Sequence, residues 1–148
     1  ALLPKYRGRF STAHVLFNGE KKTGVTLHYI DKGMDTGPIL FQKEYQISDT
    51  DTAKDVYDNF TKVGTNLFVK FVNKWVKGDK LLSYKQNEKE ASVCKGLPND
   101  GKIDWKWSGE QINRFIRSMT FEPFPPTSFK IGDKNMVIVE EKYFNKFK

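Results

Sequence analysis

Apolar side chains recur every three or four positions through the middle of the chain. The stripe comprises Ala53, Val56, Phe60, Val63, Leu67, Phe71 and Trp75. This spacing predicts one long amphipathic helix, which Thr52 and Asp55 begin as a capping box and Gly78 ends. A second stripe, over residues 112–119, predicts a shorter helix that Ser108 caps at its start.

Partial alternation and a high content of β-branched and aromatic residues predict two strands ahead of the long helix, over residues 23–30 and 39–47. Residues 31–38 contain two glycines and a proline, so we expect a loop between the strands. A short helix is expected over residues 11–18, with Ser11 as its N-cap. The order strand, loop, strand and long helix indicates one edge of an α/β domain. We therefore expect the chain to be the second half of a larger fold.

The C-terminal part of the chain is less regularly patterned. Residues 79–107 are mostly polar and predict irregular structure. Three prolines within residues 121–126 exclude a regular helix or strand there. Beyond them we expect a hairpin, with strands over residues 128–131 and 136–140 on either side of a Gly-Asp-Lys turn.

Composition narrows the class of protein without identifying a partner. The 148 residues are 38% hydrophobic and 29% charged, which is sufficient for a packed core. The net charge of +7 divides as +2, +2 and +3 over residues 1–50, 51–100 and 101–148, so we expect no concentrated basic face for nucleic acid. No apolar stretch approaches the roughly 18 residues of a membrane span. The one cysteine, Cys94, excludes an internal disulfide or a multi-cysteine metal site and favours a reducing, cytoplasmic setting.

The loop between the predicted strands holds the first candidates for chemistry. Asp31 and Asp35 lie four positions apart beside glycines, where sheets often position catalytic groups. A carboxylate there can orient an imidazole and stabilise its charged form, although both aspartates can equally serve only the turn. His14 and His28 are too few for a zinc site, and we expect both to be packed or surface residues. We expect Cys94 to be an unreactive thiol.

Several segments together resemble one enzyme family. Residues 1–9 read Ala-Leu-Leu-Pro-Lys-Tyr-Arg-Gly-Arg and resemble the SLLPxYRG signature of the formyltransferases that use 10-formyltetrahydrofolate. Residues 23–28 resemble the stretch that follows this signature, and residues 31–37 resemble the family's DxGxDTG loop. Residues 102–105 and 116–118 resemble its downstream IDW and IRA elements. Order and spacing match throughout, so the resemblance covers nearly the whole chain.

This resemblance implies an α/β fold in two parts. Residues 1–90 would form the C-terminal half of a Rossmann-like formyltransferase core, and residues 91–148 a small α+β region with a helix and a hairpin. The family's catalytic constellation is Asn, His and Asp, and Asp35 matches the aspartate. The Asn-x-His element precedes the SLLP signature, so we expect it, with a first half of roughly 100 residues, to be missing from a sequence that begins at Ala1. Neither histidine of this chain matches the catalytic one.

The resemblance also implies a mechanism. An amine attacks the formyl carbon of 10-formyltetrahydrofolate, Asn stabilises the oxyanion and His carries the proton. Asp35 would orient this His and raise its pKa by stabilising the imidazolium. By the same resemblance, the residues around the folate are Ala1, Leu2, Leu3, Pro4, Arg9, Asp31, Lys32, Gly33, Met34 and Asp35. Ala1 stands where Ser is usual, and residues 10–14 replace an Ala-Pro and Trp element, so we expect an altered cofactor pocket or acceptor site.

Three hypotheses about the molecule that accepts the formyl group remain open. Members of the family that act on methionyl-tRNA carry a C-terminal barrel of about 100 residues, for which residues 121–148 are too short. Members that act on nucleotide-linked amino sugars have shorter C-terminal regions, and the Phe- and Pro-rich residues 121–126 resemble theirs. We therefore favour an amino-sugar nucleotide, with Arg114 or Arg117 near its pyrophosphate, over tRNA or an inactive fragment. We expect a homodimer, with no metal and no membrane partner.

Overall fold

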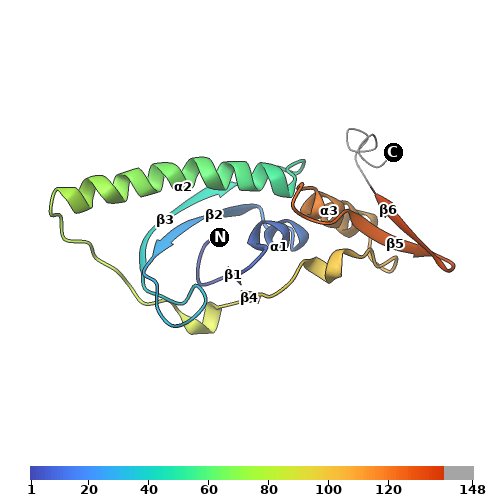
Figure 1. Cartoon of the computed structure of the whole chain (residues 1–148), viewed down its shortest axis with the longest axis horizontal. Helices are drawn as coiled ribbons and strands as arrows, with labels where there is room; N and C mark the ends of the chain where they lie inside the picture. Colours follow the sequence, from blue (N-terminus) through green and yellow to red (C-terminus); the bar gives the residue numbers. More distant parts are fainter. Residues whose placement is uncertain (139–148) are drawn as a thin grey trace.

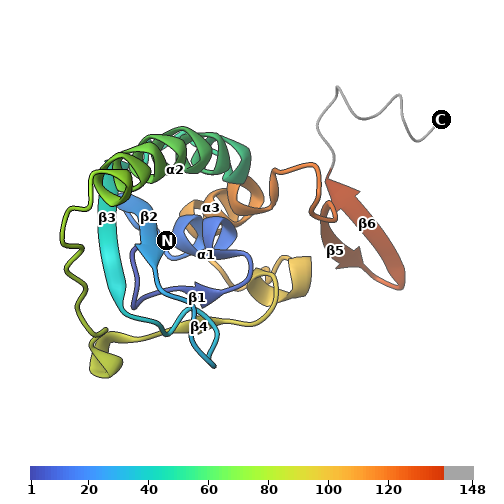
Figure 2. The same ribbon diagram turned by 60° about the vertical axis from the view of Figure 1, so that its left-hand side comes forward.

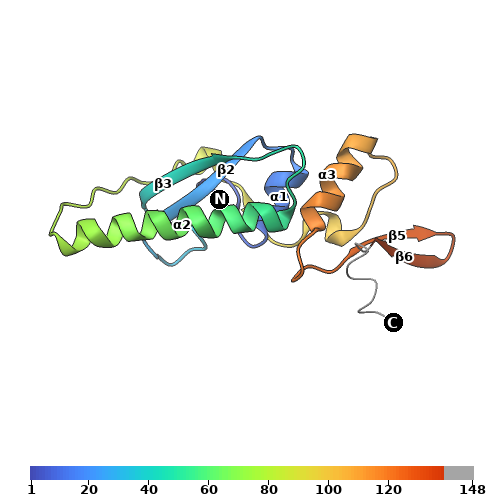
Figure 3. The same ribbon diagram turned by 90° about the horizontal axis from the view of Figure 1, so that it is seen from above.

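The computed structural model describes residues 1–138, and its central part has two layers. The long helix α2 (Ala53–Val76) lies across one face of an antiparallel pair formed by β2 (Lys22–His28) and β3 (Ile39–Gln46), as Figures 1 and 3 show. The mixed α/β class predicted from the sequence is confirmed. Although α2 is 24 residues long, neither it nor any other helix in the described residues has the apolar length that crossing a membrane requires.

Strand β2 is covered on both faces, which explains why it alternates poorly. Thr23, Gly24 and Val25 are buried one after another. A side chain at Gly24 would meet the backbone oxygen of Lys43 at 2.4 Å and the side chain of Leu2 at 2.5 Å. The N-terminal residues therefore pack against the sheet on the side opposite α2. The strand ends two residues earlier than predicted, after an irregularity between Leu27 and His28 in its pairing with β3.

Helices α1 (Ser11–Phe17) and α3 (Gly109–Met119) pack together at one end of the sheet and carry much of the core. Phe115 of α3 is fully buried, and its ring lies 5.7 Å from that of Phe17. The capping boxes predicted for α2 and α3 are both present. The prediction for α1 was wrong in one respect: its N-cap is Phe10, in a left-handed conformation, and no side chain caps the helix.

Four short elements were not predicted: three lie within residues 79–107, which were expected to be irregular, and the fourth lies near the N-terminus and pairs with one of them. Strand β1 (Arg7–Gly8) pairs in parallel with β4 (Val93–Cys94), and the pair runs below the sheet in Figure 2. The 3₁₀ helices η1 (Glu88–Glu90) and η2 (Pro98–Gly101) flank β4. The expectation for residues 79–107 was wrong at these places, since a two-residue strand is defined by a distant partner and leaves no periodic pattern.

The predicted C-terminal hairpin is present and projects from the rest of the molecule (Figures 1 and 3). It consists of β5 (Thr127–Ile131) and β6 (Lys134–Ile138). Its second strand begins two residues before Met136 because the turn is tighter than predicted, with Gly132 at a φ of 57°. Residues 139–140 of the predicted strand lie outside the described residues.

Candidate functional site

The candidate site is built around Asp35, in the loop that joins β2 to β3. Its backbone is in the left-handed region, with a φ of 56°, which aspartate tolerates better than most residues. One carboxylate oxygen, Oδ2, accepts a hydrogen bond of 2.7 Å from the backbone N–H of Gly8. The other, Oδ1, lies 3.6 Å from Nε2 of His28. The Asp35 side chain is 38% exposed, so the carboxylate is held in place and still reaches the surface.

His28 approaches Asp35 from the end of β2, which the sequence analysis did not anticipate. Its Nδ1 lies 2.8 Å from the backbone oxygen of Tyr29. Because a carbonyl can only accept, Nδ1 donates in this contact, and Nε2 is the ring nitrogen that faces Asp35. The only signal in the sequence was the position of His28 at a strand end next to the loop.

Asp31 closes the same loop from within. Its Oδ1 accepts hydrogen bonds from the hydroxyl of Thr36 at 2.5 Å and from the N–H of Gly33 at 3.0 Å. These bonds, the Thr36 hydroxyl first, hold the pKa of the exposed Asp31 carboxyl below its usual value. Lys32, Gly33 and Met34 are exposed, so this side of the loop is accessible to solvent.

The N-terminal residues predicted to line the folate are fixed against the sheet by two polar side chains. The Thr26 hydroxyl donates to the backbone oxygen of Ala1 at 2.7 Å and accepts from the N–H of Leu3 at 3.1 Å. The Gln42 amide donates to the Leu3 oxygen at 2.7 Å. Leu3 is buried, whereas Leu2 and Pro4 are partly exposed. These residues therefore form a firm wall beside β2.

Arg9, also predicted to line the folate, has its guanidinium 5.2 Å above the ring of Phe10 and is otherwise exposed. Its backbone N–H pairs with the oxygen of Cys94 at 3.1 Å. Burial raises the pKa of the Cys94 thiol, which keeps the sulfur protonated and unreactive at neutral pH.

Gln86 and Arg7, for which the sequence predicted no role, hold the loop between β2 and β3 through side-chain hydrogen bonds. The side-chain amide of Gln86 donates to the backbone oxygens of Asp35 at 2.8 Å and of Gly37 at 2.7 Å. The guanidinium of Arg7 donates to the Gln86 oxygen and forms a two-point ion pair with Glu88. Arg7 is only 4% exposed. Because Gln86 lies 51 positions from Asp35, no local pattern could have revealed the contact.

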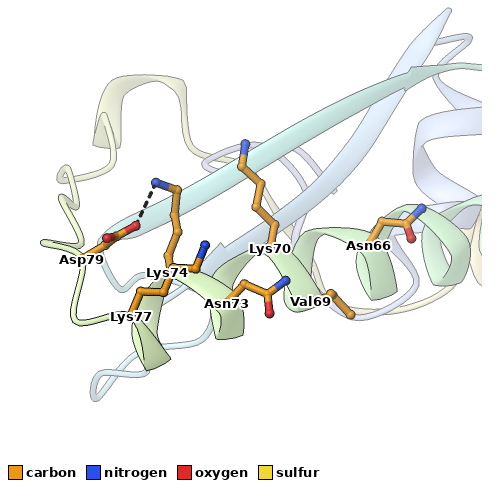
Figure 4. A pocket seen from close by; sticks show the side chains of 7 residues that line it. All are labelled: Asn66, Val69, Lys70, Asn73, Lys74, Lys77 and Asp79. Atoms are coloured by element: carbon orange, nitrogen blue, oxygen red, sulfur yellow. Dashed lines mark ion pairs between the residues drawn. The ribbon is translucent and has the colours of Figure 1, made fainter.

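Two hollows in the described surface contain none of the residues predicted to line the folate. One, of about 430 Å³, lies over the C-terminal part of α2 (Figure 4). It is lined by Asn66, Val69, Lys70, Asn73, Lys74, Lys77 and Asp79. The other, of about 460 Å³, lies between α1, β3 and α3. Within residues 1–138, no three side chains of His, Cys, Asp or Glu gather closely enough to hold a metal ion.

The arginines predicted to lie near a pyrophosphate line the second hollow but have partners within the protein. Arg114 forms an ion pair with Glu110 at 2.5 Å. Arg117 donates to the backbone oxygen of Asp51 at 2.5 Å and to the side-chain oxygen of Asn113 at 3.1 Å. Arg114 thus pairs within α3, Arg117 joins α3 to the segment before α2, and their proximity to a pyrophosphate stays a prediction.

The sequence matches known proteins over most of its length. It matches the Formyl transferase family over residues 1–72 and the Formyl transferase, C-terminal domain, family over residues 97–148. It is 39% identical to GDP-perosamine N-formyltransferase of Brucella melitensis over 134 residues, which cover 90% of this chain and 51% of that protein. It is 38% identical to methionyl-tRNA formyltransferase of Thermodesulfovibrio yellowstonii over 141 residues, which cover 95% of this chain and 44% of that protein.

The fold leads to the same group of proteins. An N-formyltransferase from Helicobacter canadensis, in complex with folinic acid and dTDP-3-aminofucose, matches with a TM-score of 0.75 and 33% identity. The match covers 88% of this chain and 48% of that one. The chain thus spans about half the length of the relatives it matches, and a domain boundary at residue 90 stays a prediction. The shared sequence motifs and the shared fold, with which half of a Rossmann-like core is consistent, place this chain in the formyltransferase family.

Proposed function

We propose that the complete enzyme containing this chain transfers a formyl group from 10-formyltetrahydrofolate to the amine of a nucleotide-linked amino sugar. The observation that carries the proposal is the placement of Asp35. Its carboxylate is anchored by the N–H of Gly8 and its side chain is 38% exposed, so a group outside this chain can reach it. His28, which lies 3.6 Å away, does not match the family's catalytic histidine. A carboxylate held in this way can assist proton transfer without reacting itself.

The residues present fit a folate. Hydrogen bonds to Thr26 and Gln42 fix the backbone at Ala1 and Leu3, giving a rigid wall with partly exposed apolar side chains. The exposed residues 31–34 offer backbone polar groups that can form hydrogen bonds with the edge of a flat ring. The predicted folate contacts are therefore proposed unchanged: Ala1, Leu2, Leu3, Pro4, Arg9, Asp31, Lys32, Gly33, Met34 and Asp35.

In this proposal the folate supplies an electrophilic formyl carbon, and the protein manages the proton. The acceptor amine forms a C–N bond to the formyl carbon, the bond from that carbon to the folate nitrogen breaks, and the amine's proton passes to the folate nitrogen. Asp35 orients the imidazole that carries the proton and stabilises its charged form, which raises its pKa. By the family resemblance this imidazole, and an amide that stabilises the oxyanion, belong to the first half of the core.

The charge distribution favours an amino-sugar nucleotide as acceptor. The net charge of +7 divides as +2, +2 and +3 over residues 1–50, 51–100 and 101–148, so basic residues are not concentrated in one segment. A surface that binds tRNA gathers cations on one face to neutralise phosphates. The relatives named above include both classes at similar identity, so methionyl-tRNA is the second candidate. A homodimer and a cytoplasmic setting belong to the same proposal, the latter because of the single cysteine.

A competition assay tests the acceptor directly. The full-length enzyme is supplied with 10-formyltetrahydrofolate and either charged initiator tRNA or a panel of amino-sugar nucleotides, and formylated products are quantified. We expect turnover with at least one amino-sugar nucleotide, rising with pH through the pKa of its amine because only the neutral amine attacks. Efficient, steeply salt-dependent transfer to tRNA with no sugar turnover would instead establish the second candidate.

A further inference from the structure

The amide of Gln86 uses all of its hydrogen-bonding positions. Its two N–H groups reach the backbone oxygens of Asp35 and Gly37, at 2.8 and 2.7 Å. Its oxygen accepts from Nε of Arg7 at 3.1 Å and from Nη2 of Arg7 at 2.8 Å. Since a carboxamide offers two donors and an acceptor with two lone pairs, no part of this group is left for another partner.

Arg7 fixes which way the amide points. A guanidinium has only donors, so the Gln86 side chain must turn its oxygen toward Arg7 and its nitrogen toward the loop. Arg7 is itself locked, since it is 4% exposed and forms a two-point ion pair with Glu88 at 2.7 and 2.8 Å. The orientation of the amide therefore follows from chemistry and does not depend on which atom is called nitrogen.

The two carbonyls that Gln86 holds belong to Asp35 itself and to Gly37, so Gln86 grips the backbone directly after the Asp35 side chain. Asp35 is in the left-handed region, a strained conformation that a residue other than glycine keeps only where surrounding contacts hold it. The side chain of Asp35 is held by Gly8, directly after Arg7 in the sequence. Arg7, Gly8 and Gln86 thus fix Asp35 at its backbone and at its carboxylate from one side.

We infer that Gln86, oriented by Arg7, is a positioning residue that sets the direction of the Asp35 carboxylate during formyl transfer. The inference rests on the proposed function of Asp35 and extends it to a residue that does not touch the substrate. A purely structural role for Gln86 would affect folding and leave the chemistry of folded enzyme unchanged. A positioning role acts through Asp35, so its effect on the rate must disappear when Asp35 is already disabled.

A double-mutant cycle on the full-length enzyme separates these roles. Gln86→Glu keeps the size of the side chain but turns a carboxylate oxygen toward the two carbonyls, which repels the loop. We expect kcat to fall by about tenfold or more, with KM for 10-formyltetrahydrofolate changed by less than about threefold. In an Asp35→Asn background the same substitution should change kcat by less than about twofold, because the two residues act as a unit.

Glu90→Gln is the control, since the exposed Glu90 lies four residues from Gln86 and its carboxylate accepts from the Asn87 side chain at 2.7 Å. We expect its kcat to stay close to that of the wild type. If Gln86→Glu does not fold, Gln86→Met, which is neutral and of similar length, takes its place in the cycle. Thermal unfolding of each variant shows that folded protein is being compared.

Two results would overturn the inference alone. One is a wild-type kcat in a folded Gln86 variant. The other is a fold-loss in kcat from the Gln86 substitution that is as large in the Asp35→Asn background as in the wild type. A third result has a different meaning. If Asp35→Asn itself keeps wild-type turnover, the proposed function of Asp35 fails, and the role of Gln86 fails with it.

Discussion

Asp35 has a left-handed backbone conformation, and its two carboxylate oxygens face different groups, the N–H of Gly8 and the ring of His28. Asn also tolerates this conformation and keeps one oxygen for the N–H of Gly8, so Asp35→Asn removes the charge with little change in shape. In the complete enzyme we expect kcat to fall by orders of magnitude, towards the ~10⁴-fold seen when a triad loses its orienting carboxylate, with a modest change in KM. Steady-state kinetics with saturating donor measures it, and near wild-type turnover would reject Asp35 as a catalytic group.

Gly8 couples the short β1–β4 pair to the same carboxylate. Its φ is +92°, and a Cβ there would lie 2.6 Å from the backbone oxygen of Cys94. Gly8→Ala must therefore move the strand and with it the N–H that binds Asp35, so we expect a loss of about 1–3 kcal/mol in stability together with reduced turnover.

Gly109→Ala is the control for this substitution, because nothing lies within 4 Å of the added methyl group and the residue begins helix α3. It should be neutral or slightly stabilising. Melting temperature and kcat are measured on both variants. If Gly8→Ala behaved like the control in both measurements, the close contact between β1 and β4 would not constrain the site.

At the scale of elements, the sequence predicted what local patterns determine. The apolar stripe and the capping box at Thr52 placed α2 correctly, because both signals lie within the helix itself. Neighbouring sequence could not reveal β1, β4 or the hold of Gln86 on the loop, since each depends on chain segments far apart in sequence. The resemblance predicted a role for Asp35 from its motif, whereas only the fold showed that His28 and Gly8 lie against it.

Tyr45 links β3 to α2, and its ionisation gives an element-scale prediction. Its hydroxyl donates to the backbone oxygen of Val56 at 2.8 Å, and burial, then the charge of Asp51, raises its pKa to about 12. In the unfolded chain a tyrosine titrates near pH 10. Between about pH 10 and 12, Tyr45 therefore loses its proton in the unfolded state before it does so in the folded state. Its contribution to the free energy of unfolding is complete below pH 10 and is lost as pH rises toward 12.

Melting temperatures measured across this pH range test the link. Tyr45→Phe should lower stability at neutral pH, through loss of the hydrogen bond, and should weaken the alkaline decline. Tyr6, whose pKa burial also raises to about 12, keeps part of the decline in that variant. A decline identical in slope to the wild type would show that Tyr45 does not contribute to it.

At the scale of the whole molecule, the described part of the chain leaves several large apolar side chains exposed. Its largest pairing is between two strands, and a two-stranded sheet needs further layers for stability. Trp75, Val76 and Leu82 are between 65% and 75% exposed near the end of α2. The projecting hairpin likewise exposes Ile131 and Val137. Large apolar side chains exposed in this way favour association.

We therefore expect the 148-residue chain, prepared alone, to self-associate, and to form a defined complex when mixed with the first half of a formyltransferase core from the same enzyme. The physical reason is that the second piece would cover the exposed apolar side chains and extend the two-stranded sheet, replacing non-specific contacts by one specific interface. Analytical ultracentrifugation of each piece and of the mixture measures this, and formyl transfer by the mixture reports whether Asp35 has regained its partners. The Asp35→Asn chain is the control, since it should assemble equally well and remain inactive. A monodisperse monomer that unfolds cooperatively without the other piece would contradict this view, because it would mean that the described elements form a complete folding unit.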